Sequence, residues 1–332
     1  MKRTVLVTGG AGFIGSNIVA RLIEDGRWEV AICDRLRTAE QAKWRNIAKH
    51  PVSDIVAPEA LFAWLDAHAS ELEAIVHMGA ISSTTEQDVD LIAHTNFSLS
   101  RDLWRWCEAK GVRLIYASSA ATYGDGAQGF SDADDLASLQ ALRPLNAYGW
   151  SKALFDIFAR READRGRAPL QWAGLKFFNV YGPNEQHKGS MKSVVAQIWP
   201  KVRAGETVCL FRSHRPDVPH GGQQRDFVYV RDATDVTLWL LDHPQVSGVY
   251  NLGSGEARTF RELAEATFRA AGKAPQIDYF DMPEAIRAAY QYRTQADMGR
   301  LRAAGYDRPM TRLDEGVGDY VSCFLSQADP YR

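Results

Sequence analysis

The chain has 332 residues, of which 45% are apolar and 24% are charged, and its formal net charge at pH 7 is −2. This composition is typical of a soluble globular protein with a large buried core, and it lacks the basic excess of a nucleic-acid-binding protein. No apolar run approaches the ~18 residues that a bilayer-spanning helix needs, so we expect neither a nucleic acid nor a membrane as a partner.

Short apolar runs alternate with helical stretches through the first third of the chain. We expect strands within residues 3–9, 28–34, 73–80 and 112–119, and helices within 12–26, 58–72 and 96–111. Strands that are apolar on both faces and separated by helices are typical of a parallel sheet covered on both sides. A Rossmann-like, doubly wound α/β fold is therefore predicted.

The pattern loosens in the second half. After a polar loop over about residues 124–147, we predict a helix at 147–166, a strand within 170–182 and a long loop at 212–227, which is rich in Gly, Pro and Gln. Further on, we expect a strand and helix at 226–244, a strand at 248–255 and a helix at 259–272 after a Thr cap. Because 248–255 resembles a return to the first sheet, a smaller C-terminal lobe is expected to interrupt that sheet. We place an NADP-binding Rossmann domain at 1–177 plus 225–257, and a substrate-binding domain at 178–224 plus 258–332.

The segment TGGAGFIG places Gly9, Gly12 and Gly15 between the first strand and the first helix. Glycine lets the backbone turn sharply and approach a pyrophosphate, and the helix N-terminus adds N–H groups and a positive partial charge. The flanking strand and helix provide the context that this motif requires. The loop therefore predicts a bound dinucleotide.

Charged residues follow the second strand. Asp34 ends that strand about 20 residues after the glycine loop, where an acidic side chain would bind the ribose hydroxyls of NAD. Arg35, Arg37 and Lys43 come next, and cations at this point bind the 2′-phosphate of NADP instead. We favour NADP, with NAD as the alternative.

Ser118 and Ser119 end the fourth strand, and YGWSK places Tyr148 and Lys152 four residues apart at the start of a helix. An i, i+4 pair lies on one helical face, and a nearby ammonium favours the tyrosinate. The serine hydroxyl would hold the substrate oxygen beside the phenol. These groups fit removal of a proton from an alcohol while a hydride leaves for nicotinamide.

The remaining reactive residue types give no further site. The four cysteines, Cys33, Cys107, Cys209 and Cys323, form no CxxC pair, and the histidines show no metal spacing, so neither a disulfide framework nor a metal is expected. The apolar run after Lys2 and Arg3 stops at Gly9, too soon for a secretory signal. We expect a cytoplasmic protein.

Several motifs together carry a family resemblance. TGGAGFIG, the Ser-Ser pair before ATYG, and YGWSK resemble the extended short-chain dehydrogenases/reductases that act on nucleotide sugars. HMGAISSTTE, YASSAATYG, FNVYGPNEQHKGSM, RDFVYVRDATDVTLWLL, YQYRTQAD and LRAAGYDRP are similar to the ADP-L-glycero-D-manno-heptose 6-epimerases, isomerases that make a lipopolysaccharide inner-core precursor. HKGSM and ISSTTE are the most specific of these, and the resemblance covers nearly the whole chain. It implies a nucleotide-sugar epimerase that assembles into a homo-oligomer.

The resemblance also implies a mechanism. An enzyme of this kind would invert C6″ of ADP-D-glycero-D-manno-heptose through a 6″-keto intermediate, with tightly held NADP and no net redox change. C6 lies outside the pyranose ring, so rotation about C5–C6 would move its oxygen away from a single base. A second acid/base on the far side removes that restriction, and the resemblance assigns it to Lys188, with Tyr148 as the other member. Such a lysine needs partial burial to lower its pKa.

The residues expected to form the site follow. The catalytic set is Tyr148, Lys188, Lys152 and Ser119. The cofactor is expected to contact Gly9, Gly12, Phe13, Ile14, Gly15, Asp34, Arg35, Lys43, Met78, Gly79, Ala80, Ile81, Ser82, Asn96, Tyr148 and Lys152. The resemblance implies substrate contacts by Ser119, Asn179, Val180, Lys188, Ser190, Gln197, Phe211, Arg225 and Tyr290, with Arg225 on a phosphate and Asn179 on a sugar hydroxyl.

The chain departs from the family pattern at two points. The loop from Arg212 to Gln224 is longer than the family's, and Pro58 stands where some members have a basic residue near the cofactor. The alternatives are a UDP-hexose 4-epimerase or a 4,6-dehydratase, and a non-catalytic nucleotide sensor. A dehydratase would show an Asp-Glu pair where this chain has Ala120-Ala121-Thr122, and a sensor would have lost Tyr148 or Lys152.

Overall fold

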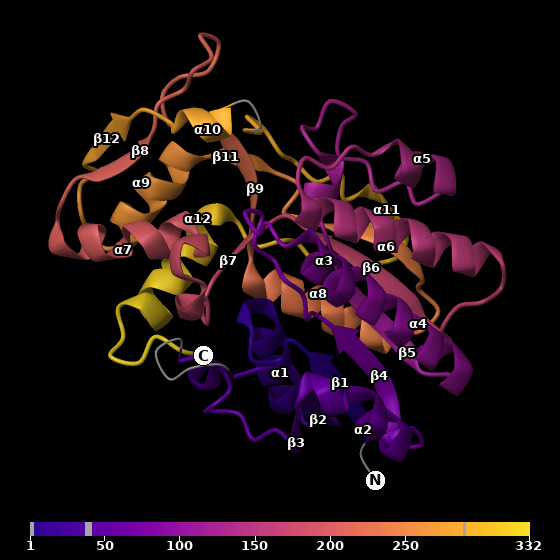
Figure 1. Cartoon of the computed structure of the whole chain (residues 1–332). Helices are drawn as coiled ribbons and strands as arrows, with labels where there is room; N and C mark the ends of the chain where they lie inside the picture. Colours follow the sequence, from indigo (N-terminus) through magenta and orange to yellow (C-terminus); the bar gives the residue numbers. More distant parts are fainter. Residues whose placement is uncertain (1–2, 37–41, 288–289) are drawn as a thin grey trace.

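The computed structural model of the chain describes residues 3–36, 42–287 and 290–332 (Figure 1). Arg37, considered above as part of the cofactor site, lies outside the described residues. Among the described helices, none combines the length and the apolar character that crossing a membrane requires. All four cysteines fall in the described part and are free thiols, Cys33 and Cys107 buried, Cys209 and Cys323 exposed.

A parallel sheet forms the larger part of the molecule. Within the described residues its seven strands follow the order β10 (Gly248–Leu252), β6 (Trp172–Phe177), β5 (Arg113–Ser119), β4 (Leu72–His77), β1 (Arg3–Thr8), β2 (Trp28–Cys33) and β3 (Asp54–Val56). Every neighbouring pair is parallel. The predicted doubly wound fold is confirmed, and residues 248–252 do return to this sheet, beside β6.

Helices cover both faces of the sheet because its strands are apolar on both sides. Val5 and Val7 of β1 contact one core, while Leu6 contacts the other. The first core is shared with α1 (Phe13–Asp25), α8 (Val230–Asp242) and α11 (Gly299–Ala303). The second core is shared with α2 (Leu61–His68), α4 (Leu99–Lys110) and α6 (Ala147–Asp164).

A smaller lobe lies above the carboxyl ends of the strands, where Figure 1 places its helices around short strands. One of its sheets joins β11 (Ala257–Thr259), β9 (Gln224–Tyr229) and β7 (Asn179–Tyr181), and another joins β12 (Ile277–Phe280) to β8 (Val208–Phe211). The third core packs these strands against α7 (Val194–Ala204), α9 (Phe260–Ala270) and α12 (Leu313–Tyr320). Strand β9 thus pairs with the lobe's strands, although the sequence places residues 225–257 with the Rossmann domain. Phe13, at the start of α1, packs into this third core and joins the two parts.

Local capping explains several element boundaries. Thr259 and Glu262 form a reciprocal capping box at the start of α9, which confirms the predicted Thr cap. Asn146 accepts from the Gly149 N–H and begins α6, and Gly26 ends α1 in the left-handed conformation at φ 76°.

The remaining elements are short. They are η2 (Lys43–Asn46), η3 (Pro58–Ala60), α3 (Val89–Ile92), the π-helical turn η4 (Ala93–Ser98), η5 (Ala120–Tyr123), α5 (Leu136–Ala141), η6 (Gln186–Met191), α10 (Glu284–Arg287) and η7 (Val321–Leu325). Helix α5 falls inside the predicted loop 124–147, which is wrong at that point because Asp135 caps a short helical turn with its carboxylate. The long loop is confirmed between β8 and β9, at residues 212–223.

Candidate active site

A cleft of about 1710 Å³ lies between the carboxyl ends of the sheet strands and the smaller lobe. Strand order reverses between β1 and β4, and such a switch point is where doubly wound sheets bind their ligands. The ends of β1, β2, β4 and β5 form the floor, and α7, α9 and β8 form the roof. The volume exceeds that of an ordinary small-molecule pocket, ~300–1,000 Å³, and so leaves room for a dinucleotide and a nucleotide sugar together.

Nearly all of the predicted site residues line this one cleft. They are Gly9, Gly12, Phe13, Ile14, Gly15, Asp34, Arg35, Lys43, Met78, Gly79, Ala80, Ile81, Ser82, Ser119, Tyr148, Lys152, Asn179, Val180, Lys188, Ser190, Gln197, Phe211, Arg225 and Tyr290. Asn96 is the exception: it is buried, and its amide bonds the Ile81 N–H (2.8 Å), the Ile81 carbonyl (3.0 Å) and Ser151 Oγ (3.1 Å). Asn96 therefore holds the backbone of Ile81, a residue of the cleft wall, without lining the cleft itself.

The glycine loop is packed too tightly for any side chain. A Cβ at Gly15 would lie 2.2 Å from the carbonyl oxygen of Gly9, and a Cβ at Gly9 would lie 2.7 Å from the Gly79 nitrogen. Gly9 also has φ +66°, a conformation that L side chains rarely adopt. The glycines therefore allow the turn between β1 and α1 to form, and they leave its backbone open to a bound phosphate.

Asp34 lies at the end of β2 with its carboxylate fully engaged. One oxygen accepts from the Ala11 N–H at 2.9 Å, and the other accepts from its neighbour's backbone N–H and from the Lys43 ammonium. The Asp34 and Lys43 side chains are 8% and 14% exposed. Arg35 is exposed and pairs with Glu59. This corner of the cleft thus holds two cation–carboxylate pairs, Lys43 with Asp34 and Arg35 with Glu59.

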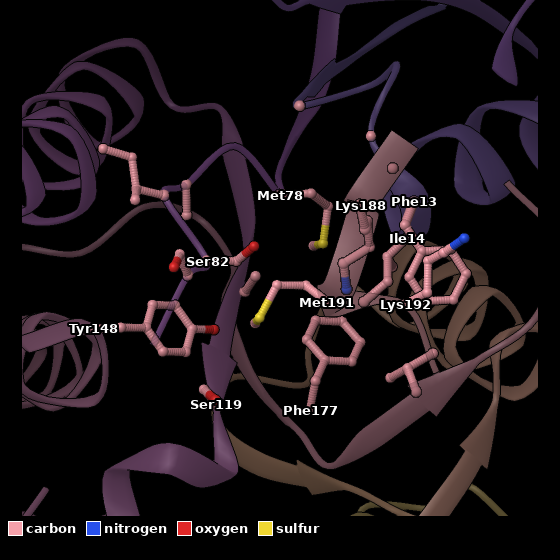
Figure 2. A pocket seen from close by; sticks show the side chains of 18 of the residues that line it. Phe13, Ile14, Met78, Ser82, Ser119, Tyr148, Phe177, Lys188, Met191 and Lys192 are labelled. Atoms are coloured by element: carbon pink, nitrogen blue, oxygen red, sulfur yellow. The ribbon is translucent and has the colours of Figure 1, made fainter. Parts of the chain in front are cut away.

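Tyr148 and Ser119 lie side by side at one side of the cleft (Figure 2). Ser119 Oγ accepts from the Ala121 N–H at 3.1 Å, which fixes the hydroxyl in place. Burial raises the pKa of Tyr148, and the hydrogen bond with Ser119 opposes that rise. The sequence predicts that Lys152 lowers this pKa. The structure corrects that expectation, because the Lys152 ammonium donates to the Ala117 carbonyl at 2.7 Å and burial dominates at the phenol.

A buried charged network underlies these catalytic groups. Asp156, one turn after Lys152, accepts from Ser118 Oγ at 2.6 Å and Tyr116 Oη at 3.1 Å. It also pairs with Lys176 at 3.7 Å, and both side chains are 1% exposed. Burial lowers the pKa of Lys152 to about 8, and the Asp156 charge opposes that shift. The network ties α6 to β5 and so fixes Tyr148 relative to Ser119.

Lys188 lies on the other side of the cleft from Tyr148. Figure 2 shows Lys188 next to Phe13, with Met191 between this group and the phenol. The Lys188 ammonium lies 5.3 Å from the centre of the Phe13 ring. Burial lowers the pKa of Lys188, and the nearby Glu185 carboxylate opposes this. The predicted partial burial of this lysine is present.

Arg225 is a buried cation in the roof of the cleft. Its side chain contacts the rings of Tyr290 (5.0 Å) and Phe260 (5.6 Å) and donates to the Gln224 carbonyl at 2.8 Å. Among the described residues no carboxylate pairs with it. Burial lowers its pKa, but guanidinium remains charged. A buried charge needs a counter-charge, and an anionic ligand in the cleft would supply one.

Gln197 has a contact that the sequence did not indicate. Its amide donates to the carbonyls of Ser190 (3.2 Å) and Lys192 (2.6 Å), so it supports the loop that carries Lys188. Met191 and Lys192 also line the cleft, although sequence reasoning did not include them. Their position directly after HKGS was the available signal.

Three comparisons with known proteins agree with this geometry. Residues 5–253 match the family described as NAD dependent epimerase/dehydratase. The chain is 48% identical to a Nitratidesulfovibrio vulgaris protein named ADP-L-glycero-D-manno-heptose-6-epimerase, over 98% of this chain and 99% of that one. Among solved structures, the Helicobacter pylori protein of the same name is 28% identical, with a TM-score of 0.78 over 96% of this chain and 95% of that one. The Thermus thermophilus UDP-glucose 4-epimerase, solved in complex with NAD, is 30% identical, with a TM-score of 0.72 over 95% and 96% of the two chains.

Proposed function

The chain belongs to the NAD dependent epimerase/dehydratase family, and within it we propose that the chain inverts C6″ of ADP-D-glycero-D-manno-heptose to give ADP-L-glycero-D-manno-heptose. Near-full-length identity of 48% to a relative named for this activity supports the proposal. The observation that carries the mechanism is the placement of two proton-transfer groups, Tyr148 and Lys188, on different sides of one cleft (Figure 2).

The described residues fit a nicotinamide dinucleotide. The glycine loop leaves backbone N–H groups open at the N-terminus of α1, and Met78 to Ser82 continue the cleft wall after β4. When bound, the nicotinamide supplies an acceptor and then a donor of hydride for C6″. The protein's own contribution is to hold the carbinol, to move its proton and to exclude water.

We propose that the cofactor is NADP. Lys43 neutralises Asp34, so this carboxylate does not repel a 2′-phosphate, and the exposed guanidinium of Arg35, which pairs with Glu59, lies at the same corner. Pro58 also lines the corner but brings no charge. Lys43→Met should weaken NADP binding at least ~10-fold, the value of one charge-assisted hydrogen bond, and should leave NAD binding nearly unchanged. Equal losses for the two cofactors would contradict this assignment.

Two acid/base groups solve the stereochemical problem of an exocyclic carbinol. With the C6″ hydroxyl next to Tyr148, the phenol oxygen takes up its proton in the ionised form of Tyr148. Burial opposes this ionisation, and the hydrogen bond with Ser119 favours it. The 6″-ketone then rotates about C5–C6 and presents its oxygen to Lys188, whose ammonium protonates it as hydride returns to the other face. Burial moves the pKa of Lys188 down towards the range where it can act in both directions.

The rest of the cleft holds the sugar nucleotide in this proposal. Arg225 contacts the diphosphate, Asn179 and Ser190 contact the sugar, and Phe211 and Tyr290, whose rings are 6.2 Å apart, form an aromatic wall. We propose that residues 1–177 together with α8 and β10 hold the cofactor, and that 178–224 and 258–332 together with β9, which carries Arg225, hold the substrate. The position of β10 in the large sheet supports that division.

The direct test is incubation of the protein with ADP-D-glycero-D-manno-heptose, followed by NMR to read the C6″ configuration. Tyr148→Phe and Lys188→Met should each reduce interconversion by ~10²-fold or more while NADP stays bound. Lys192→Met, at a neighbouring lysine of the same cleft, is the matched control and should reduce it far less. Normal turnover in both variants would reject the two-base mechanism, and turnover of a UDP-hexose instead would reject the substrate.

A further inference from the structure

Glu185 is a fully buried carboxylate directly before the segment that carries Lys188. Its side chain accepts from the N–H and the Oγ (2.6 Å) of Ser193, and from Tyr320 Oη (3.0 Å). Ser193 begins α7, and Tyr320 ends α12. We propose that Glu185 is a positioning residue that closes the loop 186–192 from both ends and supplies the counter-charge of Lys188. This inference rests on the acid/base role proposed for Lys188.

We call the hydrogen bonds of the Glu185 carboxylate with Ser193 and Tyr320 the clasp. Because Glu185 starts the loop and its carboxylate holds the residue that ends it, the seven residues between, 186–192, are fixed at both ends. Backbone contacts continue the clasp: the Lys188 N–H donates to the Glu185 carbonyl at 3.0 Å. Gly189, at φ +56°, makes the turn that follows Lys188. Without the carboxylate, Lys188 would depend mainly on the Gln197 amide beyond the loop.

The clasp also has a charge. Three donors surround the carboxylate of Glu185: the Ser193 N–H on one oxygen, and the Ser193 and Tyr320 hydroxyls on the other. Hydrogen bonds to a carboxylate favour its ionised form. Burial raises the pKa of Glu185, and the bonds from Ser193 and Tyr320 and the charge of Lys188 oppose this. Glu185 in turn is the charged group that favours the ammonium of Lys188 against burial.

Other titratable groups face this loop from the elements packed against it. They are His187 within the loop, Asp34 and Lys43 across the cleft, and Tyr320 behind it. Burial lowers the pKa of His187 to about 4, so this imidazole is neutral near pH 7. Burial holds the pKa of Tyr320 well above its usual value. Among the described residues, Glu185 is the charged group that raises the pKa of Lys188 against burial, whereas Lys43 and Asp34 act on His187.

Glu185→Gln is the decisive variant because it keeps the shape and removes the charge. Lysines are dimethylated with ¹³C-formaldehyde, and the Lys188 signal, assigned by its loss in Lys188→Met, is titrated by NMR. In Glu185→Gln the pKa of Lys188 should move further down, and kcat should fall ~10-fold or more, with NADP affinity unchanged. Ser193→Ala and Tyr320→Phe remove single bonds but leave the charge, so in them the Lys188 pKa should stay at the wild-type value.

The outcomes distinguish failure of the inference about Glu185 from failure of the proposed function. If Lys188 titrates in Glu185→Gln as in the wild type, or if kcat is unchanged, the inference is overturned. If the wild type does not convert the ADP-heptose, the proposed function fails, and the NMR titration still decides the role of Glu185. Should Glu185→Gln not fold, the double variant Ser193→Ala/Tyr320→Phe replaces it: loss of kcat supports the clasp, and wild-type kcat overturns it.

Discussion

Replacing Asp156 by asparagine tests the buried network beneath the catalytic groups. The amide keeps the size of the side chain. Its one oxygen can accept from one of the two hydroxyls, Ser118 or Tyr116, and its NH2 group can donate to the other. It removes the counter-charge of Lys176, whose side chain is 1% exposed and whose ammonium otherwise contacts Thr122 Oγ1 (3.1 Å) and the Tyr123 ring. We expect a large loss of stability because a buried ammonium is left without its partner.

The magnitude follows from burial. Breaking a buried ion pair by removing one partner costs about 3–5 kcal/mol. With an unfolding entropy of about 2.1 cal/mol/K per residue, a chain of 332 residues loses roughly 4–7 °C of melting temperature. The exposed pair Arg215–Asp217, at 53% and 59% exposure, is the matched control, and Asp217→Asn should leave the melting temperature nearly unchanged.

Calorimetric melting of the cofactor-free protein measures both variants. The double variant Asp156→Asn/Lys176→Met, which removes both charges, should recover most of the loss, since uncharged replacements of buried pairs are often close to neutral. Asp156→Asn melting within 1 °C of the wild type would refute the reasoning. So would a double variant that is no more stable than Asp156→Asn alone.

Three other outcomes are expected. Gly15→Ala should abolish measurable NADP binding by fluorescence titration, because its Cβ would lie 2.2 Å from a carbonyl oxygen, whereas Gly318→Ala, with nothing within 4 Å, should bind normally. Burial lowers the pKa of His77 to about 3, so the stability that neutral His77 contributes is complete above its unfolded pKa of ~6.5 and is lost as the pH falls towards 3. Urea unfolding should therefore show a free energy of unfolding about 2 kcal/mol lower at pH 5 than at pH 7. His77→Gln should remove this part of the pH dependence. Arg225→Met should weaken binding of ADP ~10–100-fold in calorimetric titration, and the exposed Arg212→Met should not; equal effects would contradict a phosphate contact at Arg225.

The large sheet could be predicted from sequence because its strands are apolar on both faces and glycines mark the ends of α1 and α4. The sequence pattern does not reveal the strands of the smaller lobe, where β7, β11 and β12 have three or four residues each. Such strands are too short to show alternation, and their partners are distant in sequence, as β12 is from β8. Strand β9 is polar in its first half and apolar only from Phe227 to Tyr229, and nothing in this pattern indicated its pairing with β7 and β11.

The residues that line the cleft were predictable where a motif fixes them, as at Gly15 and Tyr148. The residues that hold the cleft wall in place through hydrogen bonds could not be predicted. Gln197 and Asn96 make their contacts with backbone carbonyls and amides whose positions depend on the folded chain. The phenol pKa was predicted in the wrong direction because the sequence shows that Lys152 is near Tyr148, but not that the ring is buried or that the ammonium bonds Ala117.

The return of β10 to the large sheet has a consequence for dissection of this protein. The polypeptide passes from the large sheet to the small lobe after β6 and comes back at α8 and β10. Neither half is a contiguous stretch, so one proteolytic nick in the 212–223 loop would leave two fragments held together by their shared cores. An expressed 1–177 fragment would have a bare β6 edge and would lack α8 from one face, and we expect it to aggregate unless the remainder of the chain is supplied in trans.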